Sequence, residues 1–241
     1  MDNFKRKASA LGIELSEKQL EQFKKYYDML IEKNKVMNLT AITEWEEVID
    51  KHFIDSISLV KAIDLSGDKY VLDLGCGAGF PGIPLKIAFP NLKIVLLDSL
   101  NKRILFLKEV IEELGLENIE ALHGRAEDYA RKPEYREQFD YCVSRAVANL
   151  NSLSEICLPF VKEGGSFISY KSMKGIEELE QAGKAIRLLG GNLEKTEQFV
   201  LEEESAGVEP MERNFIRINK VKATPKKYPR KPGTPFKEPL Y

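Results

Sequence analysis

The chain has 241 residues, of which 43% are hydrophobic and 31% are charged, and its formal net charge is −2. This composition is typical of a globular protein, and the length suits one α/β domain with an appendage but not two full domains. The N-terminus has no apolar run of signal-peptide length, and no uncharged stretch approaches the roughly 18 residues of a membrane helix, so we expect a cytoplasmic protein with no membrane segment.

Two helical patterns come first in the chain. Ser16 to Gln19 has the pattern of a capping box, and the apolar residues that follow recur at helical spacing, which predicts a helix of about five turns. A second box, Thr43 to Glu46, predicts a helix that carries apolar residues from Trp45 to Val60. Because both helices precede any predicted strand, we expect residues 1–66 to form an N-terminal helical cap.

Residues 67–220 alternate short apolar runs with helical patterns, which is typical of a parallel sheet with crossover helices. The seven predicted strands are Tyr70–Leu74, Leu92–Asp98, Ile119–His123, Phe139–Ser144, Ser166–Lys171, Glu197–Leu201 and Asn214–Asn219. The predicted helices lie near Pro84–Phe89, Leu100–Leu114, Ser152–Val161 and Gly175–Leu189. The pattern predicts an α/β fold: a seven-stranded, mostly parallel, doubly wound sheet with helices on both faces. Right-handed crossovers put the ligand crevice at the carboxyl ends of the first and fourth strands.

Residues 221–241 form a basic, proline-rich tail. Its five prolines, from Pro225 to Pro239, exclude a helix there and favour an extended segment. Lysines and arginines alternate with Tyr228, Phe236 and Tyr241, a pattern that suits RNA because aromatic side chains stack on bases while cations meet phosphates. Aromatic residues that hold the tail against the fold would give the same pattern. We expect the tail either to pack on the domain or to extend from it.

The stretch Tyr70–Gly82, Y-V-L-D-L-G-C-G-A-G-F-P-G, can be read in two ways. Its last six residues match the G-x-G-x-x-G fingerprint of dinucleotide sites. Read from Asp73, the same letters are an acid at the end of a strand, followed by Gly75, Gly77 and Gly79. An acid would repel the pyrophosphate of a dinucleotide, whereas it suits the sulfonium and ammonium groups of S-adenosylmethionine. Asp73 therefore favours S-adenosylmethionine as the cofactor.

Two later segments extend the predicted cofactor site. Asp98 ends the second strand, where an acid can accept hydrogen bonds from both ribose hydroxyls. After the third strand, Gly124–Asp128 can hold the adenine through backbone groups or through an acid that accepts from its amine. An acid, three alternate glycines, a second acid and an acidic third loop, in this order, predict a site for the methyl donor.

The methyl acceptor is predicted from what the sequence lacks. After the fourth strand there is no Asp/Asn-Pro-Pro-aromatic turn of the kind used to methylate exocyclic amines. Carbon methylation of pyrimidines needs a thiolate, and the three cysteines lie in turn, strand and helix patterns instead. Guanine N7 already carries a free lone pair, so its methylation needs in-line placement and no general base. We therefore assign no catalytic base, and with two histidines and no C-x-x-C pair we expect no metal site.

These residues resemble one family closely, the bacterial small-subunit ribosomal RNA guanine-N7 methyltransferases, also called glucose-inhibited division protein B. The resemblance extends from the first helix to the last residues. Its glycine turn is shared with many methyltransferases, whereas the remaining motifs in combination are far more specific. The motifs are N-L-T-A-I-T (38–43), K-H-F-I-D-S (51–56), V-L-D-L-G-C-G-A-G-F-P-G-I-P (71–84), L-L-D-S-L-N-K-R (96–103), V-S-R-A (143–146) and P-R-K-P-G-T-P-F-K-E-P-L (229–240).

This resemblance implies a Rossmann-like class I S-adenosylmethionine-dependent methyltransferase fold. It also implies transfer of a methyl group to N7 of a guanine in 16S ribosomal RNA, which would make 7-methylguanosine. By motif position it implies cofactor contacts at Gly75, Phe80, Ala126, Glu127 and Arg145, with Asp98 at the ribose. Phe236 is less typical of the tail motif in this family, and we infer nothing about function from this difference.

Several single residues have both a structural and a functional interpretation. Arg145 lies at the expected crevice, where a contact with cofactor or guanine is favoured over an ordinary ion pair. His52 and Asp55 lie one turn apart in the cap, where a packed histidine bonded to a neighbour is the expected outcome. Lys171 and Lys174, after the fifth strand, fit solvated charges and RNA contacts equally well. The predicted RNA contacts are Arg145, Lys171, Arg230 and Lys231.

Two alternatives to the RNA methyltransferase stay open. One is a methyltransferase that acts on another RNA, a protein or a small molecule, and the other is a binding module or a nicotinamide dehydrogenase that uses G-A-G-F-P-G. We expect deletion of residues 225–241 to abolish RNA methylation and to leave cofactor affinity intact. The charge is unevenly distributed, with an acidic run at 202–212 followed by the basic tail, and this also suggests a partly assembled small ribosomal subunit, rather than free RNA, as the partner.

Overall fold

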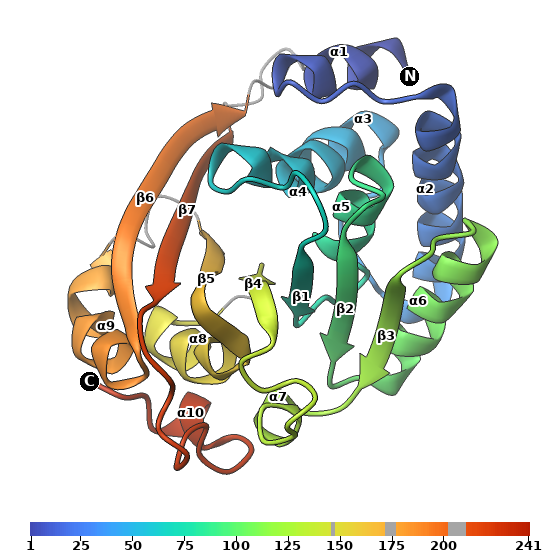
Figure 1. Ribbon diagram of the computed structural model, residues 1–241. Coiled ribbons are helices and arrows are strands. Elements are labelled where there is room, and N and C mark those ends of the chain that lie inside the picture. The colour runs from blue at the N-terminus through green and yellow to red at the C-terminus, as the bar shows by residue number, and fades with distance from the viewer. Residues whose placement is uncertain (146–147, 172–176, 202–210) are drawn as a thin grey trace.

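A computed structural model describes residues 1–145, 148–171, 177–201 and 211–241 of the chain. Its centre is a seven-stranded sheet in the order β3-β2-β1-β4-β5-β7-β6, in which β7 runs antiparallel to both of its neighbours and the other pairs are parallel (Figure 1). The strands are β1 (Tyr70–Leu74), β2 (Lys93–Asp98), β3 (Ile119–His123), β4 (Phe139–Ser144), β5 (Val161–Lys171), β6 (Gly191–Leu201) and β7 (Met211–Lys220). The predicted mostly parallel sheet is confirmed, and the order reverses between β1 and β4, where the crevice was expected.

Helices cover both faces of the sheet (Figure 1). One face carries α5 (Gly82–Ala88) and α6 (Asn101–Glu113), and the other carries α8 (Leu150–Cys157) and α9 (Glu177–Leu188). The strands serve both faces because successive side chains point in opposite directions. In β2, Ile94 and Leu96 pack in the core on the α5 side, while Val95 and Leu97 pack on the α8 side.

The N-terminal segment is more helical than its sequence pattern predicts. The predicted first helix is α2 (Glu17–Met37), and its capping box at Ser16 and Gln19 is confirmed. A preceding helix, α1 (Asp2–Ala10), was not predicted. It buries Phe4 and Ala8, and its Lys7 forms a buried ion pair of 2.6 Å with Asp50. Nine residues give too few apolar positions for a helical period to stand out, so α1 depends on these tertiary contacts.

The second predicted capping box was wrong. The helix begins at Trp45, and its N-cap residue Glu44 makes no capping hydrogen bond through its side chain. The following turns change type rather than forming one regular helix. They are α3 (Trp45–Val48), a π-helix (Ile49–Ile54), α4 (Asp55–Ile57) and a 3-10 turn (Ser58–Lys61). A π-turn in a helix is often found at a functional site.

The cap packs against the sheet rather than standing apart from it. Gln19 Nε2 donates to the carbonyl oxygen of Ile87 at the end of α5, at 2.7 Å. Tyr170 Oη, from β5, donates to the carbonyl oxygen of Ser56 at 2.9 Å. Phe53 packs against Phe23, with ring centroids 5.0 Å apart, so one apolar core runs from the cap into the α5 side of the sheet.

Strands β5, β6 and β7 are longer than predicted. β5 begins at Val161 instead of Ser166, β6 at Gly191 instead of Glu197, and β7 at Met211 instead of Asn214. The added residues are mostly polar or glycine, so they lack the apolar run on which the prediction depended. Antiparallel pairing of β6 with β7 supplies backbone hydrogen bonds for the residues added to these two strands.

The C-terminal tail returns across the α8 side of the molecule. Arg136 holds it by donating to the carbonyl oxygens of Tyr228 and Thr224, at 3.0 and 2.8 Å. The expectation that prolines exclude a helix there was wrong, because α10 (Thr234–Lys237) forms one short turn. Its proline lies in the first turn, where the missing N–H has no helical partner to lose. α10 lies next to α8 (Figure 1).

Candidate functional site

The glycine turn after β1 needs glycine for two different reasons. Gly75, Gly77 and Gly79 all have positive φ, at 74°, 60° and 108°. At Gly79 a Cβ would also lie only 2.7 Å from Tyr26 Oη. At Gly77 a Cβ would meet no side chain, so its space is open. Tyr26, from α2, donates to the carbonyl oxygen of Ala78 at 2.6 Å and thereby fixes the turn from the cap side.

Asp73 lies behind this turn rather than in front of it. Its carboxyl group is fully buried, and Oδ2 accepts the N–H of Gly82, at the start of α5, at 2.8 Å. Oδ1 has no hydrogen-bond partner. Burial raises the pKa of Asp73 from 3.8 to about 7. Asp73 does not line either of the two cavities described below. A direct contact with a cofactor therefore stays a prediction, and the contact seen here is with the backbone of α5.

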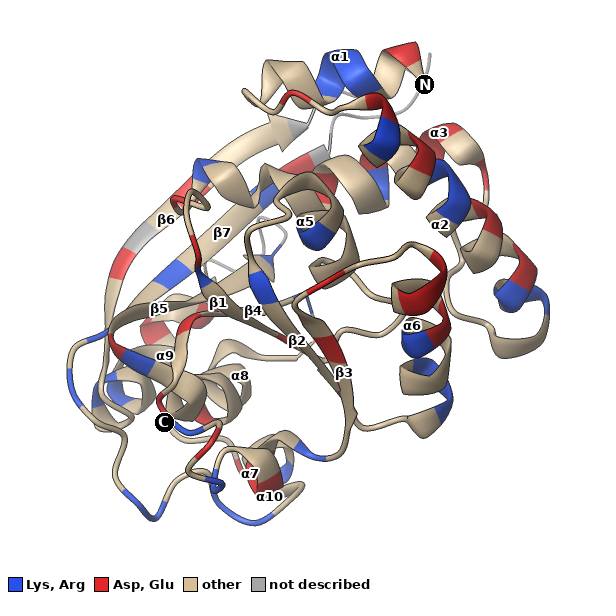
Figure 2. Ribbon diagram, turned by 45° about the vertical axis from the view of Figure 1, so that its right-hand side comes forward, with Lys and Arg blue, Asp and Glu red and all other residues tan. Residues whose placement is uncertain are grey.

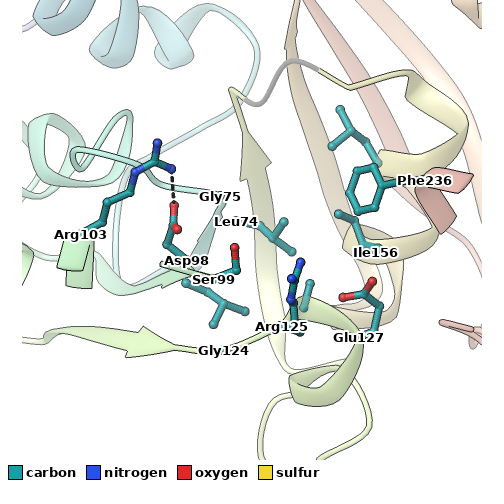
Figure 3. A pocket seen from close by; sticks show the side chains of 13 residues that line it. Leu74, Gly75, Asp98, Ser99, Arg103, Gly124, Arg125, Glu127, Ile156 and Phe236 are labelled. Carbon is teal, nitrogen blue, oxygen red and sulfur yellow. Dashed lines mark hydrogen bonds and ion pairs between the residues drawn. The ribbon is translucent and has the colours of Figure 1, made fainter. Parts of the chain in front are cut away.

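The larger cavity at the ends of β1, β2 and β3 has a volume of about 330 Å³. Its polar side is built by Asp98, which is 4% exposed. Asp98 Oδ2 accepts from the N–H of Gly77 at 2.9 Å and from Arg103 Nη1 at 3.3 Å, and Oδ1 accepts from the N–H of Leu100 at 2.9 Å (Figure 3). A carboxylate oxygen has two acceptor positions, so a ligand hydroxyl can still bind. The Asp98 carboxylate thus joins the glycine turn to the start of α6.

The opposite side of this cavity is mostly apolar. Ile156 of α8 and Phe236 of α10 face Asp98 across it (Figure 3), and Leu153 of α8 also lines the cavity. Between the two sides runs the predicted adenine loop, of which Gly124, Arg125, Ala126 and Glu127 all line the cavity. A carboxylate on one side, backbone groups below and an apolar wall opposite suit a ribose that carries a flat base. The residues present therefore fit the nucleoside part of the predicted cofactor.

Glu127 has a partner that the sequence did not indicate. Its carboxylate is 3% exposed, and Oε1 accepts the N–H of Gly233, in the tail, at 2.8 Å. The predicted acid of the adenine loop therefore also anchors the C-terminal tail.

A smaller cavity of about 160 Å³ lies on the other side of the glycine turn. The cap contributes Leu39, Thr40 and His52, the turn contributes Gly75–Ala78 and Phe80, and β4 leads to Arg145. The His52 ring stacks on Phe80, with centroids 4.4 Å apart. The Arg145 guanidinium lies 5.0 Å from the same ring, within the range of a cation–π contact. Residues from both the cap and the sheet therefore build this part of the site.

Arg145 is held by three groups of the cap. Nη1 pairs with Asp55 Oδ2 at 2.9 Å and donates to the carbonyl oxygen of Lys51 at 3.1 Å. Nη2 lies 3.3 Å from His52 Nδ1. Asp55 is fully buried and also pairs with Arg213 of β7. The expected packed histidine is found, and it packs in the site itself beside Arg145.

His52 is held in its neutral form. Burial, with Arg145 next, lowers the pKa of His52 from 6.5 to about 3. Nδ1 lies 3.3 Å from Arg145 Nη2 and 3.0 Å from the carbonyl oxygen of Lys51, and Nε2 lies 2.9 Å from Thr40 Oγ1. Both ring nitrogens are therefore engaged within the protein.

The predicted RNA contacts lie in different surroundings. Lys171 pairs with Glu178 at 3.0 Å, and its side chain is 10% exposed. Arg230 forms a bidentate pair with the buried Glu155. Any contact of these two side chains with RNA would have to form in addition to the ion pairs that they already make. Lys231 is exposed, and Figure 2 shows basic segments on the loops around α10. Lys174 and Ala146 lie outside the described residues, as does most of the acidic run at 202–212.

Several site residues were missed by sequence reasoning. Arg103 was quoted in a motif without a role, although its position five residues after Asp98 could have suggested the pair. Thr40 likewise belonged to a motif. Leu153, Ile156 and Tyr26 carry only ordinary helical patterns, because apolar positions on a helix do not reveal which of them line a cavity.

None of the helices in the described residues has both the length and the apolar character that a membrane span requires. The same residues contain no group of three or more histidine, cysteine or acidic side chains arranged to hold a metal ion.

The fold resembles several solved structures, among them a putative methyltransferase of Bacillus halodurans with a TM-score of 0.51 and 16% identity, over 70% of this chain and 99% of that chain. TYW2 of P. horikoshii in complex with MeSAdo has a TM-score of 0.55 and 17% identity, over 70% of this chain and 63% of that chain. TYW2 of M. jannaschii in complex with AdoMet has a TM-score of 0.51 and 17% identity, over 69% and 77%. At such identities the likeness concerns the fold alone, and the predicted Rossmann-like class I methyltransferase fold is confirmed.

Sequence relatives are much closer. Ribosomal RNA small subunit methyltransferase G of Lachnoclostridium phytofermentans is 59% identical over 231 residues, covering 96% of this chain and 93% of that protein. The protein of the same name from Staphylococcus epidermidis strain RP62A is 54% identical over 97% of this chain and 95% of its own length. The family described as GidB, rRNA small subunit methyltransferase G, matches residues 19–206. The chain belongs to this methyltransferase family, which sets aside the dehydrogenase interpretation of G-A-G-F-P-G.

Proposed function

We propose that the protein transfers the methyl group of S-adenosylmethionine to N7 of one guanine in 16S ribosomal RNA. The proposal is supported by family membership across nearly the whole chain and by one observation on the site. The two cavities lie on either side of one glycine turn, and both include Gly75 in their lining. One cofactor can therefore reach from the nucleoside side to the Arg145 side.

Different residues would hold the ribose, the adenine and the methionine end of the cofactor. Asp98 would accept from the ribose hydroxyls, and the loop from Gly124 to Glu127 would contact the adenine. Gly75, Gly77 and Phe80 would contact the methionine end. When bound, S-adenosylmethionine supplies an electrophilic methyl group on its sulfonium.

The chain's own contribution to transfer is placement. Guanine N7 attacks with its lone pair and loses no proton, so no side chain has to act as a base. The site agrees with this requirement, since His52 has both nitrogens engaged and Arg145 is permanently charged. Arg145 is fixed by Asp55, so it can offer hydrogen bonds to the base without first being ordered. The N-terminal cap supports this side of the turn, where Tyr26 binds the carbonyl oxygen of Ala78 and His52 lines the smaller cavity.

The partner of the reaction is the ribosomal RNA, in our proposal as part of an incompletely assembled small subunit in the cytoplasm. The exposed lysines around α10, including Lys227 and Lys231, would meet its phosphates. Subunits and naked 16S RNA from cells lacking the gene can be compared as substrates. Higher activity on the subunits would support assembly-dependent recognition, and equal activity would count against it.

The function itself is tested by mapping 7-methylguanosine in 16S RNA from cells with and without the gene. The proposal expects one position to lose N7 methylation in the deleted strain and to regain it when the gene is restored. Unchanged 7-methylguanosine at every position would contradict it.

A further inference from the structure

The C-terminal tail takes part in the larger cavity, which the sequence did not indicate. We propose that the tail completes one wall of the cofactor site through Phe236 and that this side chain stacks on the adenine of bound cofactor. This inference rests on the proposed function for the identity of the cofactor. It gives the tail a role in cofactor binding beside the RNA contacts proposed above.

The position of Phe236 supports this role. Its side chain lines the cavity together with Leu153 and Ile156, opposite Asp98 (Figure 3). It is 48% exposed, which is unusual for a phenylalanine, and the cavity accounts for exposed ring surface. A flat base bound between the adenine loop and α8 would cover that surface. Aromatic rings are the usual partners for stacked bases.

The segment of the tail that leads to Phe236 is anchored at three residues. Gly233 donates its N–H to Glu127 Oε1 at 2.8 Å, which ties the tail to the predicted adenine loop. Ser152 Oγ, from α8, donates to the carbonyl oxygen of Pro235 at 2.6 Å. Arg230 Nη2 pairs with the buried Glu155 at 2.7 Å. These bonds bring α10, α8 and the adenine loop together, so the ring is positioned before any ligand arrives.

The contacts of the tail change the expected effect of its deletion. Loss of residues 225–241 would remove Phe236 and leave Glu127 Oε1 and Glu155 without their tail partners. Unpaired buried carboxylates are costly. Deletion is therefore expected to weaken cofactor binding as well as RNA methylation, and it does not separate the two. A single side chain has to be changed instead.

The test is calorimetric titration of the full-length protein with S-adenosylhomocysteine and with 5′-methylthioadenosine, which lacks the amino acid. Phe236→Ala is expected to weaken binding of both ligands by about the same factor, roughly 5- to 150-fold, since alanine substitution of a stacking aromatic costs about 1–3 kcal/mol. Tyr241→Ala is the matched control. Tyr241 is also an exposed tail aromatic, at 72%, and it does not line the cavity.

The outcomes separate this inference from the proposed function. Binding of both ligands by Phe236→Ala within twofold of the unchanged protein overturns the role of Phe236 and leaves the function standing. A loss confined to S-adenosylhomocysteine also overturns it, because the adenine is common to both. Failure of the unchanged protein to bind either ligand refutes the cofactor assignment itself. Thermal unfolding without ligand is expected to be the same for Phe236→Ala and Tyr241→Ala, because both side chains are substantially exposed.

Discussion

Arg145, at the end of β4, and Asp55, in the N-terminal cap, form an ion pair of 2.9 Å between Nη1 and Oδ2. The two residues are 90 positions apart, and Asp55 is completely buried. Arg213 of β7 binds the other oxygen of the same carboxylate. One acid of the cap thus joins two strands of the sheet and fixes the cation of the site. The cap is therefore an integral part of the site.

Replacing this acid should destabilise the fold and slow the reaction. Asp55→Asn would leave two arginines around a neutral amide, and both arginines are partly exposed and can be hydrated. We therefore expect the free energy of unfolding to fall by about 1–3 kcal/mol, less than for a fully buried pair. Urea unfolding measures this value, and methyl transfer should fall as well because Arg145 is no longer fixed.

The matched control for that substitution is Asp28→Asn. Asp28 pairs with Lys24 on the surface of α2, where the two side chains are 57% and 49% exposed. Such a pair contributes at most about 0.5 kcal/mol. Equal unfolding free energies for the two variants would contradict the structural role given to Asp55.

The glycine turn can be tested at its open position. In Gly77→Ala the added methyl group contacts no side chain, and the backbone φ is 60°. Gly115→Ala, in a distant turn, adds a methyl group that also contacts no side chain, at φ 58°. Each should cost about 1–2 kcal/mol of stability from the left-handed backbone. Only Gly77→Ala should also weaken cofactor binding, by roughly 10-fold or more, because its methyl group faces the ligand. Equal cofactor affinity in the two variants would refute the assignment of this turn.

His52 predicts a specific pH dependence of stability. Its pKa is lowered from 6.5 to about 3 in the folded protein, so between these values the unfolded chain binds the additional proton. The stabilising contribution is complete above pH 6.5 and is lost as pH falls through that window, by at most about 1.4 kcal/mol per pH unit. Asp73 acts in the opposite direction, because its raised pKa favours the folded state at low pH and this contribution is lost as pH rises through about 7.

Comparison with His52→Gln separates the contribution of His52 to the pH dependence of stability from that of Asp73. Glutamine can still accept from Arg145 and donate to Thr40, but it does not titrate. Unfolding in urea at pH 7.5 and pH 5 should show the unchanged protein losing more stability than His52→Gln on acidification. If the difference between the two proteins is the same at both pH values, the neutral buried histidine is ruled out.

The RNA surface predicted around α10 consists of exposed lysines, so we expect its interaction with RNA to be electrostatic. Replacing Lys227 and Lys231 together by alanine should lower RNA affinity and reduce the magnitude of its salt slope by about 1.5, near 0.7–0.9 for each lost phosphate contact. Cofactor affinity should stay the same, since neither lysine lines the cavity. Lys18→Ala, on α2 across the sheet from α10, is the control (Figure 1). An unchanged salt slope for the double variant would exclude these two contacts.

The sequence predicted the parts of the molecule that follow a local pattern. β1, β3 and β4 have the predicted limits, because short apolar runs with clear ends produced them. Asp98, Gly124 and Ala126 lie in one cavity because parallel strands bring their carboxyl ends to one edge of a sheet. Thus the polar side of the candidate site was predictable from strand order alone.

What the sequence did not predict depends on contacts between distant segments. α1 is stabilised by Phe4 and by the pair of Lys7 with Asp50, and Phe236 reaches the cavity only because Glu127 and Ser152 hold the tail. The position of Asp73 was also not predictable. Its charge suggested a direct contact with a cation, whereas its contact is with the backbone of α5. Residue type alone does not say on which side of a turn a side chain lies.

Methyl transfer to guanine N7 can be measured with the purified protein and small ribosomal subunits from cells that lack the gene. S-adenosylmethionine labelled in its methyl group is added, and the RNA is digested to nucleosides and mapped. We predict that the label appears as 7-methylguanosine at a single position of 16S RNA and that Gly77→Ala reduces it. Label in a different nucleoside, or only in protein or small molecules, would contradict it.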